Sequence, residues 1–269
     1  MALAHIHYWS PALGKQCAMY VTLPDDVREP LPVVYQLHGL SDDHSMWQRR
    51  TSIERYAERY RLMVVMPDGG RSFYCDSELG RWETHLLDTI DFVDRVLPSI
   101  KDGAGRAIGG LSMGGYGAMK MALKHPDRFA SVVAHSGCLD VADDKELRGV
   151  PELGRLFARG VPPADDCLAL ARVFAKRRGR RPALRFDCGV DDFLIRQNRA
   201  FHAHLDQLGV AHEYAELPGA HSWEYWDQHV DTALQFHRRA FTVGAAKPAP
   251  PRTRVPTRTA RARALKAAR

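Results

Sequence analysis

The sequence lacks the features that mark membrane-spanning and exported proteins. No apolar run approaches the ~18 residues that a membrane-spanning helix needs. The opening residues, from Met1 to Trp9, contain no basic stretch followed by an apolar one, so they do not resemble a secretory signal. From these two absences we expect a cytoplasmic protein without a membrane span.

Cysteine is scarce, and the usual metal and nucleotide motifs are missing. The five cysteines (17, 75, 138, 167 and 188) form no C-x-x-C pair, and their odd number does not fit a disulfide framework or a zinc knuckle. The sequence contains no H-E-x-x-H motif, no clustered Asp/His set, no dinucleotide fingerprint and no P-loop. We therefore expect neither a metal nor another cofactor.

Acidic residues are absent from the C-terminal segment 244–269, which carries eight Lys and Arg residues. Without those eight, 30 basic residues face 32 acidic ones, so residues 1–243 carry a charge of about −2. The domain itself therefore gives no reason to expect specific nucleic-acid binding. We expect the Pro- and Ala-rich tail to be disordered. It suits contact with anionic surfaces such as nucleic acid or phospholipid, or it is simply a solubilising extension.

What the sequence does contain is a series of apolar strands alternating with helices. Strands are expected in two segments between 5 and 24, and at 30–39, 62–66, 106–112, 129–135, 183–188 and 213–217. Helices are expected at 45–60, 82–97, 117–124, 195–208 and 222–241. This order predicts one α/β domain over residues 1–243, with a mostly parallel central sheet and helices on both faces. A mainly helical insertion, 139–182, follows the sixth strand, where it could cover the carboxyl edge of the sheet.

The sharpest local signal is Gly110-Leu-Ser112-Met-Gly114, a G-x-S-x-G motif between a strand and a helix. In that setting the turn is strained and lifts the serine hydroxyl above the sheet, which predicts that Ser112 is a nucleophile. Ser136 lacks the upstream glycine and is a poor rival.

A serine nucleophile needs a base that is oriented by an acid, and this fold supplies them in the order Ser, acid, His. His221 follows the last predicted strand, and Asp191 and Asp192 follow the strand before it. We favour Asp192 because Gly189 leaves room for a turn before it. The alternative for Asp191 is a solvated carboxylate or a helix cap. We assign the oxyanion donors to the backbone N–H groups of Leu40 and Met113, and expect His38 to be structural.

With these residues the chain resembles the esterase D-like branch of the α/β-hydrolases, which includes S-formylglutathione hydrolases, tributyrin and feruloyl esterases, and mycolyltransferases. The resemblance spans about residues 5–240 and rests on five segments: 35–40, 67–70, 110–118, 189–194 and 218–226. It implies a Ser112–Asp192–His221 triad and an α/β-hydrolase fold. The region of Phe73, Tyr74 and Trp82 corresponds to one near the active site of relatives, so these residues either line the substrate pocket or merely pack the loop.

The leading hypothesis is a serine carboxylesterase that cleaves short-chain or aromatic acyl esters of small molecules through an acyl-enzyme. The alternatives are a mycolyltransferase-like acyltransferase, an S-formylglutathione thioesterase, and a catalytically idle binding fold. The sequence leaves open the natural substrate and the oligomeric state.

Overall fold

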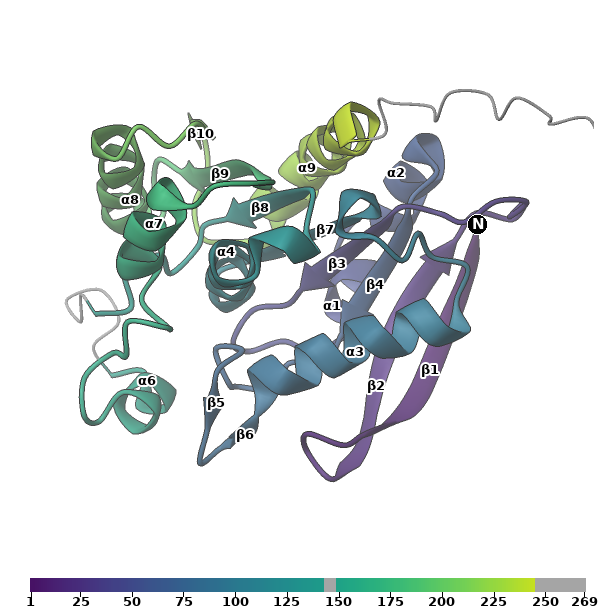
Figure 1. Cartoon of the computed structure of the whole chain (residues 1–269), viewed down its shortest axis with the longest axis horizontal. Coiled ribbons are helices and arrows are strands. Elements are labelled where there is room, and N and C mark those ends of the chain that lie inside the picture. The colour runs from purple at the N-terminus through teal and green to yellow at the C-terminus, as the bar shows by residue number, and fades with distance from the viewer. Residues whose placement is uncertain (143–148, 245–269) are drawn as a thin grey trace, which may run out of the picture.

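The computed structural model describes residues 1–142 and 149–244 (Figure 1). Residues 143–148 of the predicted insertion lie outside the described residues. So do residues 245–269, which make up nearly all of the predicted basic tail.

An eight-stranded sheet forms the centre of the molecule, in the order β1-β2-β4-β3-β7-β8-β9-β10. Its strands are β1 (Ala2–Ser10), β2 (Lys15–Leu23), β3 (Val33–Leu37), β4 (Met63–Pro67), β7 (Arg106–Leu111), β8 (Ser131–His135), β9 (Ala183–Gly189) and β10 (Glu213–Leu217). β1 and β2 pair antiparallel, as do β2 and β4, whereas the other neighbours in the sheet (β4-β3-β7-β8-β9-β10) pair parallel. A separate small ribbon joins β5 (Asp76–Ser77) to β6 (Gly80–Arg81).

Helices cover both faces of the sheet (Figure 1). They are α1 (Met46–Arg50), α2 (Ile53–Tyr60), α3 (Trp82–Val96), α4 (Met113–Lys124), α6 (Pro151–Leu156), α7 (Cys167–Lys176), α8 (Ile195–Gln207) and α9 (Trp223–Gly244), with 3-10 turns η1 (Gly103–Gly105) and η2 (Pro126–Arg128). Because side chains alternate along a strand, Val33 and Tyr35 pack in the core beneath α3, α4, α7 and α8, whereas Val34 packs beneath α1, α2 and α9. The predicted mostly parallel sheet with two helical layers, and the helical insertion after its sixth strand, are confirmed.

Two helix predictions differ from the structure. The segment 45–60 forms two helices, because Thr51 is extended and the N–H of Ser52 binds Asp227 of α9 at 2.9 Å. Helix α4 begins at Met113 rather than Gly117. Its glycines are packing sites instead of helix breakers: a Cβ on Gly117 would lie 2.5 Å from the ring of Tyr74.

The carboxyl ends of the parallel strands meet at one edge of the sheet, and this edge positions the candidate site. The loops after β3, β7, β9 and β10 carry Leu40, Ser112, Asp192 and His221 respectively. Within residues 1–142 and 149–244, no helix has both the length and the apolar character needed to cross a bilayer.

Candidate active site

Ser112 occupies a strained turn between β7 and α4. Its backbone adopts φ 53° and ψ −117°, a conformation that L-residues rarely adopt. The N–H of Ser112 donates to the carbonyl of His135 at 2.9 Å, and the carbonyl of Ser112 accepts from the N–H of Tyr116 at 3.0 Å. These bonds to β8 and to the first turn of α4 hold the strained residue in place, with its hydroxyl at the edge of the sheet.

The glycines on either side of Ser112 are required by close backbone contacts. A Cβ on Gly110 would lie 2.5 Å from the carbonyl oxygen of Gly114, and a Cβ on Gly114 would lie 2.5 Å from the carbonyl oxygen of Leu37. Both distances are far below van der Waals contact, and backbone atoms cannot give way as a flexible side chain can. The turn therefore forms only when both positions lack a side chain.

The structure brings Ser112, His221 and Asp192 into one chain of hydrogen bonds. The Nε2 of His221 lies 3.0 Å from the Oγ of Ser112, and its Nδ1 lies 2.9 Å from Oδ2 of Asp192 and 3.1 Å from Oδ1. Because an ionised carboxylate only accepts hydrogen bonds, Nδ1 carries the proton and Nε2 is free to accept the serine proton. This arrangement can activate a serine hydroxyl.

The two candidate acids differ in burial and direction. Asp192 is 2% exposed, and its Oδ1 also accepts the N–H of Leu194 at 2.8 Å, which fixes the carboxylate toward the imidazole. Asp191 is exposed, and its N–H donates to the carbonyl of Gly219 at 2.9 Å. Of the two, Asp192 is the one that contacts His221.

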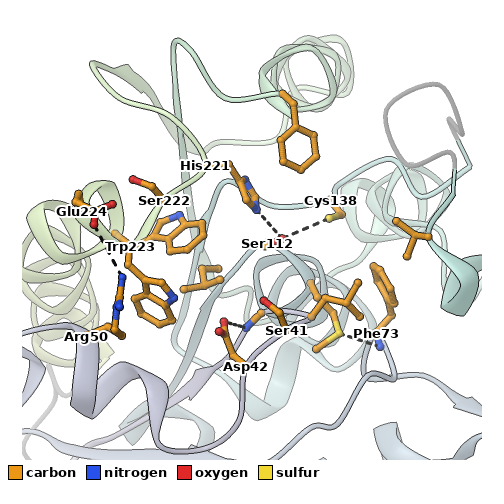
Figure 2. Close-up of a pocket in the computed structure, with 17 residues that line it drawn as sticks. Ser41, Asp42, Arg50, Phe73, Ser112, Cys138, His221, Ser222, Trp223 and Glu224 are labelled. Carbon is orange, nitrogen blue, oxygen red and sulfur yellow. Dashed lines mark hydrogen bonds and ion pairs between the residues drawn. The ribbon is translucent and has the colours of Figure 1, made fainter.

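An open pocket of about 550 Å³ lies over Ser112. Leu40 and Met113, whose N–H groups are the predicted oxyanion donors, both border it. In Figure 2, Phe73 and Cys138 lie on one side of Ser112, whereas Trp223 lies on the other. The pocket therefore has largely apolar walls around a polar reacting group, as small-molecule sites commonly do.

His38 is buried and is not among the residues that line the pocket. It is 1% exposed, its Nδ1 donates to the carbonyl of Gly39 at 2.8 Å, and its Nε2 accepts the N–H of Gly69 at 2.8 Å. These bonds tie the loop after β3, which carries Leu40, to the loop after β4. The sequence-based expectation of a structural role agrees with this geometry.

The comparisons with known proteins match esterases and serine hydrolases. A family model described as "Putative esterase" matches residues 10–237, most of the chain. The chain belongs to this esterase family.

Individual relatives of this esterase carry related names. An acetyl esterase of Caldicellulosiruptor saccharolyticus is 29% identical, covering 88% of this chain and 98% of the relative. A solved S-formylglutathione hydrolase (FrmB) of Staphylococcus aureus is 31% identical, with a TM-score of 0.80, covering 88% of this chain and all of the other. FphF, a fluorophosphonate-binding serine hydrolase of Staphylococcus aureus, is 29% identical with a TM-score of 0.82, covering 88% of this chain and 98% of the other. These matches confirm the predicted α/β-hydrolase fold of a serine hydrolase.

The three aromatic residues predicted near the substrate take different places in the esterase. Phe73 lines the pocket, in a left-handed conformation with φ 50°. Tyr74 is 1% exposed, and its hydroxyl donates to the carbonyl of His38 at 3.1 Å, so it supports the loop from behind. The indole N–H of Trp82 donates to the carbonyl of Leu79 at 3.1 Å. The structure does not place Tyr74 or Trp82 in the pocket wall.

Several pocket residues were missed by reasoning from the sequence. Arg50, Phe193 and Glu224 line the pocket, and Val150 reaches it from the insertion. Phe193 could have been found from its position beside Asp192. Arg50 and Val150 carry no sequence signal, because α1 and the insertion reach the pocket only through the tertiary fold.

The insertion is also tied to the pocket rim by an ion pair. Glu152 of α6 accepts from the guanidinium of Arg71 at 2.6 Å, and Arg71 also donates to the carbonyl of Leu40 at 3.2 Å. The described part of the insertion is thus linked through Arg71 to the loop that carries a predicted oxyanion donor.

Proposed function

We propose that the protein hydrolyses carboxylic esters of small acyl groups through an acyl-enzyme formed on Ser112. The observation that carries the proposal is the unbroken chain of hydrogen bonds from Ser112 through His221 to Asp192 at the base of an open pocket.

Acylation begins when the Oγ of Ser112 attacks the ester carbonyl. A bond forms between Oγ and the carbonyl carbon, the proton of Oγ passes to Nε2 of His221, and the carbonyl oxygen becomes an oxyanion. Asp192 stabilises the imidazolium through the bond to Nδ1. The oxyanion is received by the N–H groups of Leu40 and Met113, and each such donor lowers the barrier by about 3–4 kcal/mol in related sites.

The tetrahedral intermediate then collapses. The bond between the carbonyl carbon and the alcohol oxygen breaks, and Nε2 of His221 gives its proton to the leaving alkoxide. Water repeats the sequence against the acyl-enzyme, with His221 first taking the water proton and then returning it to Ser112. The acid is released and the enzyme returns to its starting state.

The pocket favours short-chain or aromatic acyl esters. Its size of about 550 Å³ and its apolar contacts from Phe73, Phe193 and Trp223 suit a compact acyl or aryl group. The 29% sequence identity to an acetyl esterase supports a substrate with a short acyl chain.

A thioester is the second candidate, because the chain is 31% identical to the solved S-formylglutathione hydrolase. The pocket also carries the cationic Arg50, about half exposed, with Glu224 at 3.9 Å. Arg50 could receive a carboxylate of the leaving thiol. Both reactions would use the same acyl-enzyme.

One experiment tests the reaction and separates the two substrates. Turnover is measured on p-nitrophenyl esters from acetate to octanoate, on a feruloyl ester and on S-formylglutathione, for the wild type and Ser112→Ala. We expect the variant to lose at least about 10³-fold in kcat while melting within a few degrees of the wild type. Retained turnover in a folded Ser112→Ala variant would refute the proposal. The substrate with the highest kcat/KM decides between ester and thioester.

A further inference from the structure

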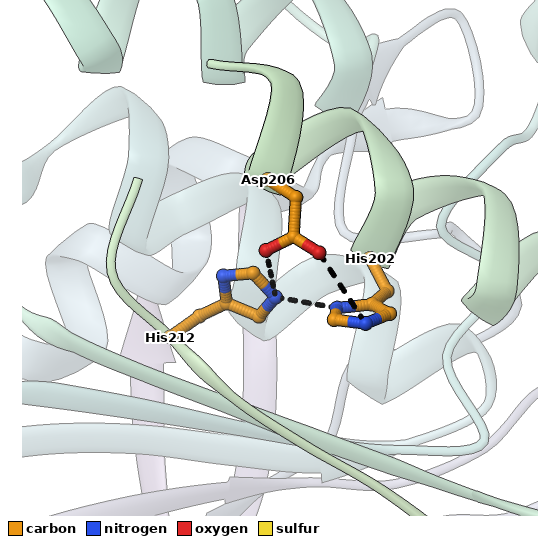
Figure 3. Close-up of side chains that lie close together, drawn as sticks. All are labelled: His202, Asp206 and His212. Atoms are coloured by element: carbon orange, nitrogen blue, oxygen red, sulfur yellow. Dashed lines mark hydrogen bonds and ion pairs between the residues drawn. The ribbon is translucent and has the colours of Figure 1, made fainter. Parts of the chain in front are cut away.

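Three side chains with metal-ligating atoms gather at the end of α8 that lies away from Asp192. His202 and Asp206 are four residues apart on α8, so they project from the same face of the helix. His212 comes from the connection between α8 and β10. One ligand atom of each residue lies within 4.8 Å of the other two (Figure 3). The sequence shows no clustered Asp/His set, because only the fold brings His212 to the helix.

The imidazole of His212 is held in the orientation that a metal ligand needs. Its Nδ1 donates to the carbonyl of Val210 at 2.8 Å, which leaves the lone pair of Nε2 facing His202 and Asp206. The side chain is 4% exposed, and its ring stacks on Phe186 with centroids 5.6 Å apart. A backbone carbonyl that fixes the tautomer of a ligating histidine is the usual support of such a residue.

The other two ligands are held less tightly and can adjust. The ring of His202 stacks on Tyr214 at 4.6 Å, and its Nδ1 lies 2.7 Å from Nε2 of His212. Asp206 is 61% exposed, with its oxygens 3.5 Å from His202 Nε2 and 3.9 Å from His212 Nε2. Two nitrogens bound to one tetrahedral cation at 2.0–2.1 Å would stand about 3.3 Å apart, so the rings must separate by roughly half an ångström.

We propose that His202, Asp206 and His212 form a binding site for a divalent transition-metal cation of the Zn²⁺ type. Two imidazoles and one carboxylate select Zn²⁺ and its first-row neighbours over Mg²⁺ and Ca²⁺, which prefer all-oxygen sites. The partial exposure of His202 and Asp206 leaves the remaining coordination position to water.

The site would stabilise the fold rather than take part in catalysis. Helix α8 begins just after Asp192, and its 13 residues put the far end about 20 Å away. A cation held by α8 and by the segment before β10 cross-links that connection in the folded chain only, so it raises Tm by mass action. Binding of the cation does not depend on the proposed esterase reaction.

The full-length, EDTA-treated protein is titrated with ZnCl₂ by calorimetry and with Co²⁺ by visible spectroscopy, and Tm is measured with and without each cation. We expect one saturable Zn²⁺ site, ligand-field bands of Co²⁺ bound to nitrogen, and a higher Tm with Zn²⁺. MgCl₂ and CaCl₂ should give neither heat nor a Tm shift. No saturable Zn²⁺ binding by the folded wild type would overturn the proposal.

Substitutions of the three ligands, with a matched control, test which residues bind the cation. His202→Ala, Asp206→Asn and His212→Ala should each weaken Zn²⁺ binding at least about tenfold. Asp206→Asn is largely exposed and keeps the side-chain shape, so it tests the site even where His212→Ala fails to fold. His44→Ala is the control, because Nε2 of His44 lies 3.1 Å from Nε2 of His5 in a second imidazole pair. Binding that survives in all three ligand variants, or that disappears in His44→Ala or His221→Ala instead, would overturn the assignment.

Discussion

Two of the carboxylate–imidazole pairs in the described structure, His221 with Asp192 and His135 with Asp187, differ in what the imidazole can reach. His221 lies 2.9 Å from Asp192, and its other ring nitrogen faces Ser112. His135 lies 2.9 Å from Asp187, and both side chains are 1% exposed. Within the part of the chain that the structure describes, Nε2 of His135 has no hydrogen-bond partner.

The contrast shows that an Asp–His pair alone does not make a catalytic group. His221 is 19% exposed and borders the pocket, so substrate can approach the bond between its Nε2 and the serine. The second pair joins facing residues of β8 and β9 and is fully buried. There Asp187 also accepts a hydrogen bond from the hydroxyl of Tyr225 at 2.9 Å. The first pair is therefore expected to govern turnover and the second to govern stability.

The largest effect is expected for Asp192→Asn. An amide cannot hold the imidazole in the tautomer that leaves Nε2 free, so kcat on p-nitrophenyl acetate should fall about 10⁴-fold. Tm should change little, because the amide oxygen can still accept the N–H of Leu194. Asp191→Asn, the exposed neighbour, is the control and should stay within about twofold of wild type. If Asp191→Asn lost turnover and Asp192→Asn did not, Asp191 would be the acid and the assignment to Asp192 would be wrong.

Asp187→Asn should instead lower the free energy of unfolding. The buried carboxylate of Asp187 accepts the ring N–H of His135 and the hydroxyl of Tyr225, and an amide weakens both contacts. Hydrogen bonds to a charged group contribute about 1.5–3 kcal/mol each, so the loss should be at least that large when measured by urea denaturation at pH 7. Turnover per folded molecule should stay within about tenfold of wild type. A loss of kcat as large as that of Asp192→Asn, with unchanged stability, would contradict the division between the pairs.

The effect of Asp187→Asn on stability should also depend on pH. Burial alone would raise the pKa of Asp187, but the charge and hydrogen bond of His135 and the hydroxyl of Tyr225 outweigh it and lower that pKa. A carboxyl with a lowered pKa in the folded state contributes stability above its unfolded pKa of about 3.9, and this contribution is lost as pH falls through the folded value. The stability gap between wild type and Asp187→Asn should therefore be full at neutral pH and shrink only below about pH 4.

The sequence predicted the sheet well because parallel strands that are buried on both sides are mostly apolar. All residues of β4 and β8 are buried, so short, mainly apolar runs bounded by turn residues were enough to find them. It predicted the positions of Ser112 and His221 because each follows a strand end that the fold places at one edge. The start of α4 was missed because glycines weaken helix propensity, whereas here they permit close packing.

The pair of His135 and Asp187 could not be predicted, because the two residues are 52 positions apart and meet only through the register of β8 with β9. The place of Arg50 in the pocket could not be predicted either, because only the tertiary fold brings α1 to the pocket. Local patterns locate strands and turns, but which side chains meet across a sheet depends on register and on the packing of distant helices.

The smallest effect is expected for Tyr225→Phe, which removes one donor from Asp187 and leaves His135 in place. A hydrogen bond to a charged group contributes about 1.5–3 kcal/mol, so the loss of stability should be smaller than that of Asp187→Asn, with kcat within about twofold of wild type. Tyr214→Phe is the matched control, because its hydroxyl donates to Glu216 at 3.0 Å in a half-buried setting. Solvent can replace that bond, so its loss should cost less than about 1 kcal/mol. Equal losses of unfolding free energy in the two variants would show that burial does not strengthen the contact with Asp187. The pair of His135 and Asp187 would then have no distinct structural role.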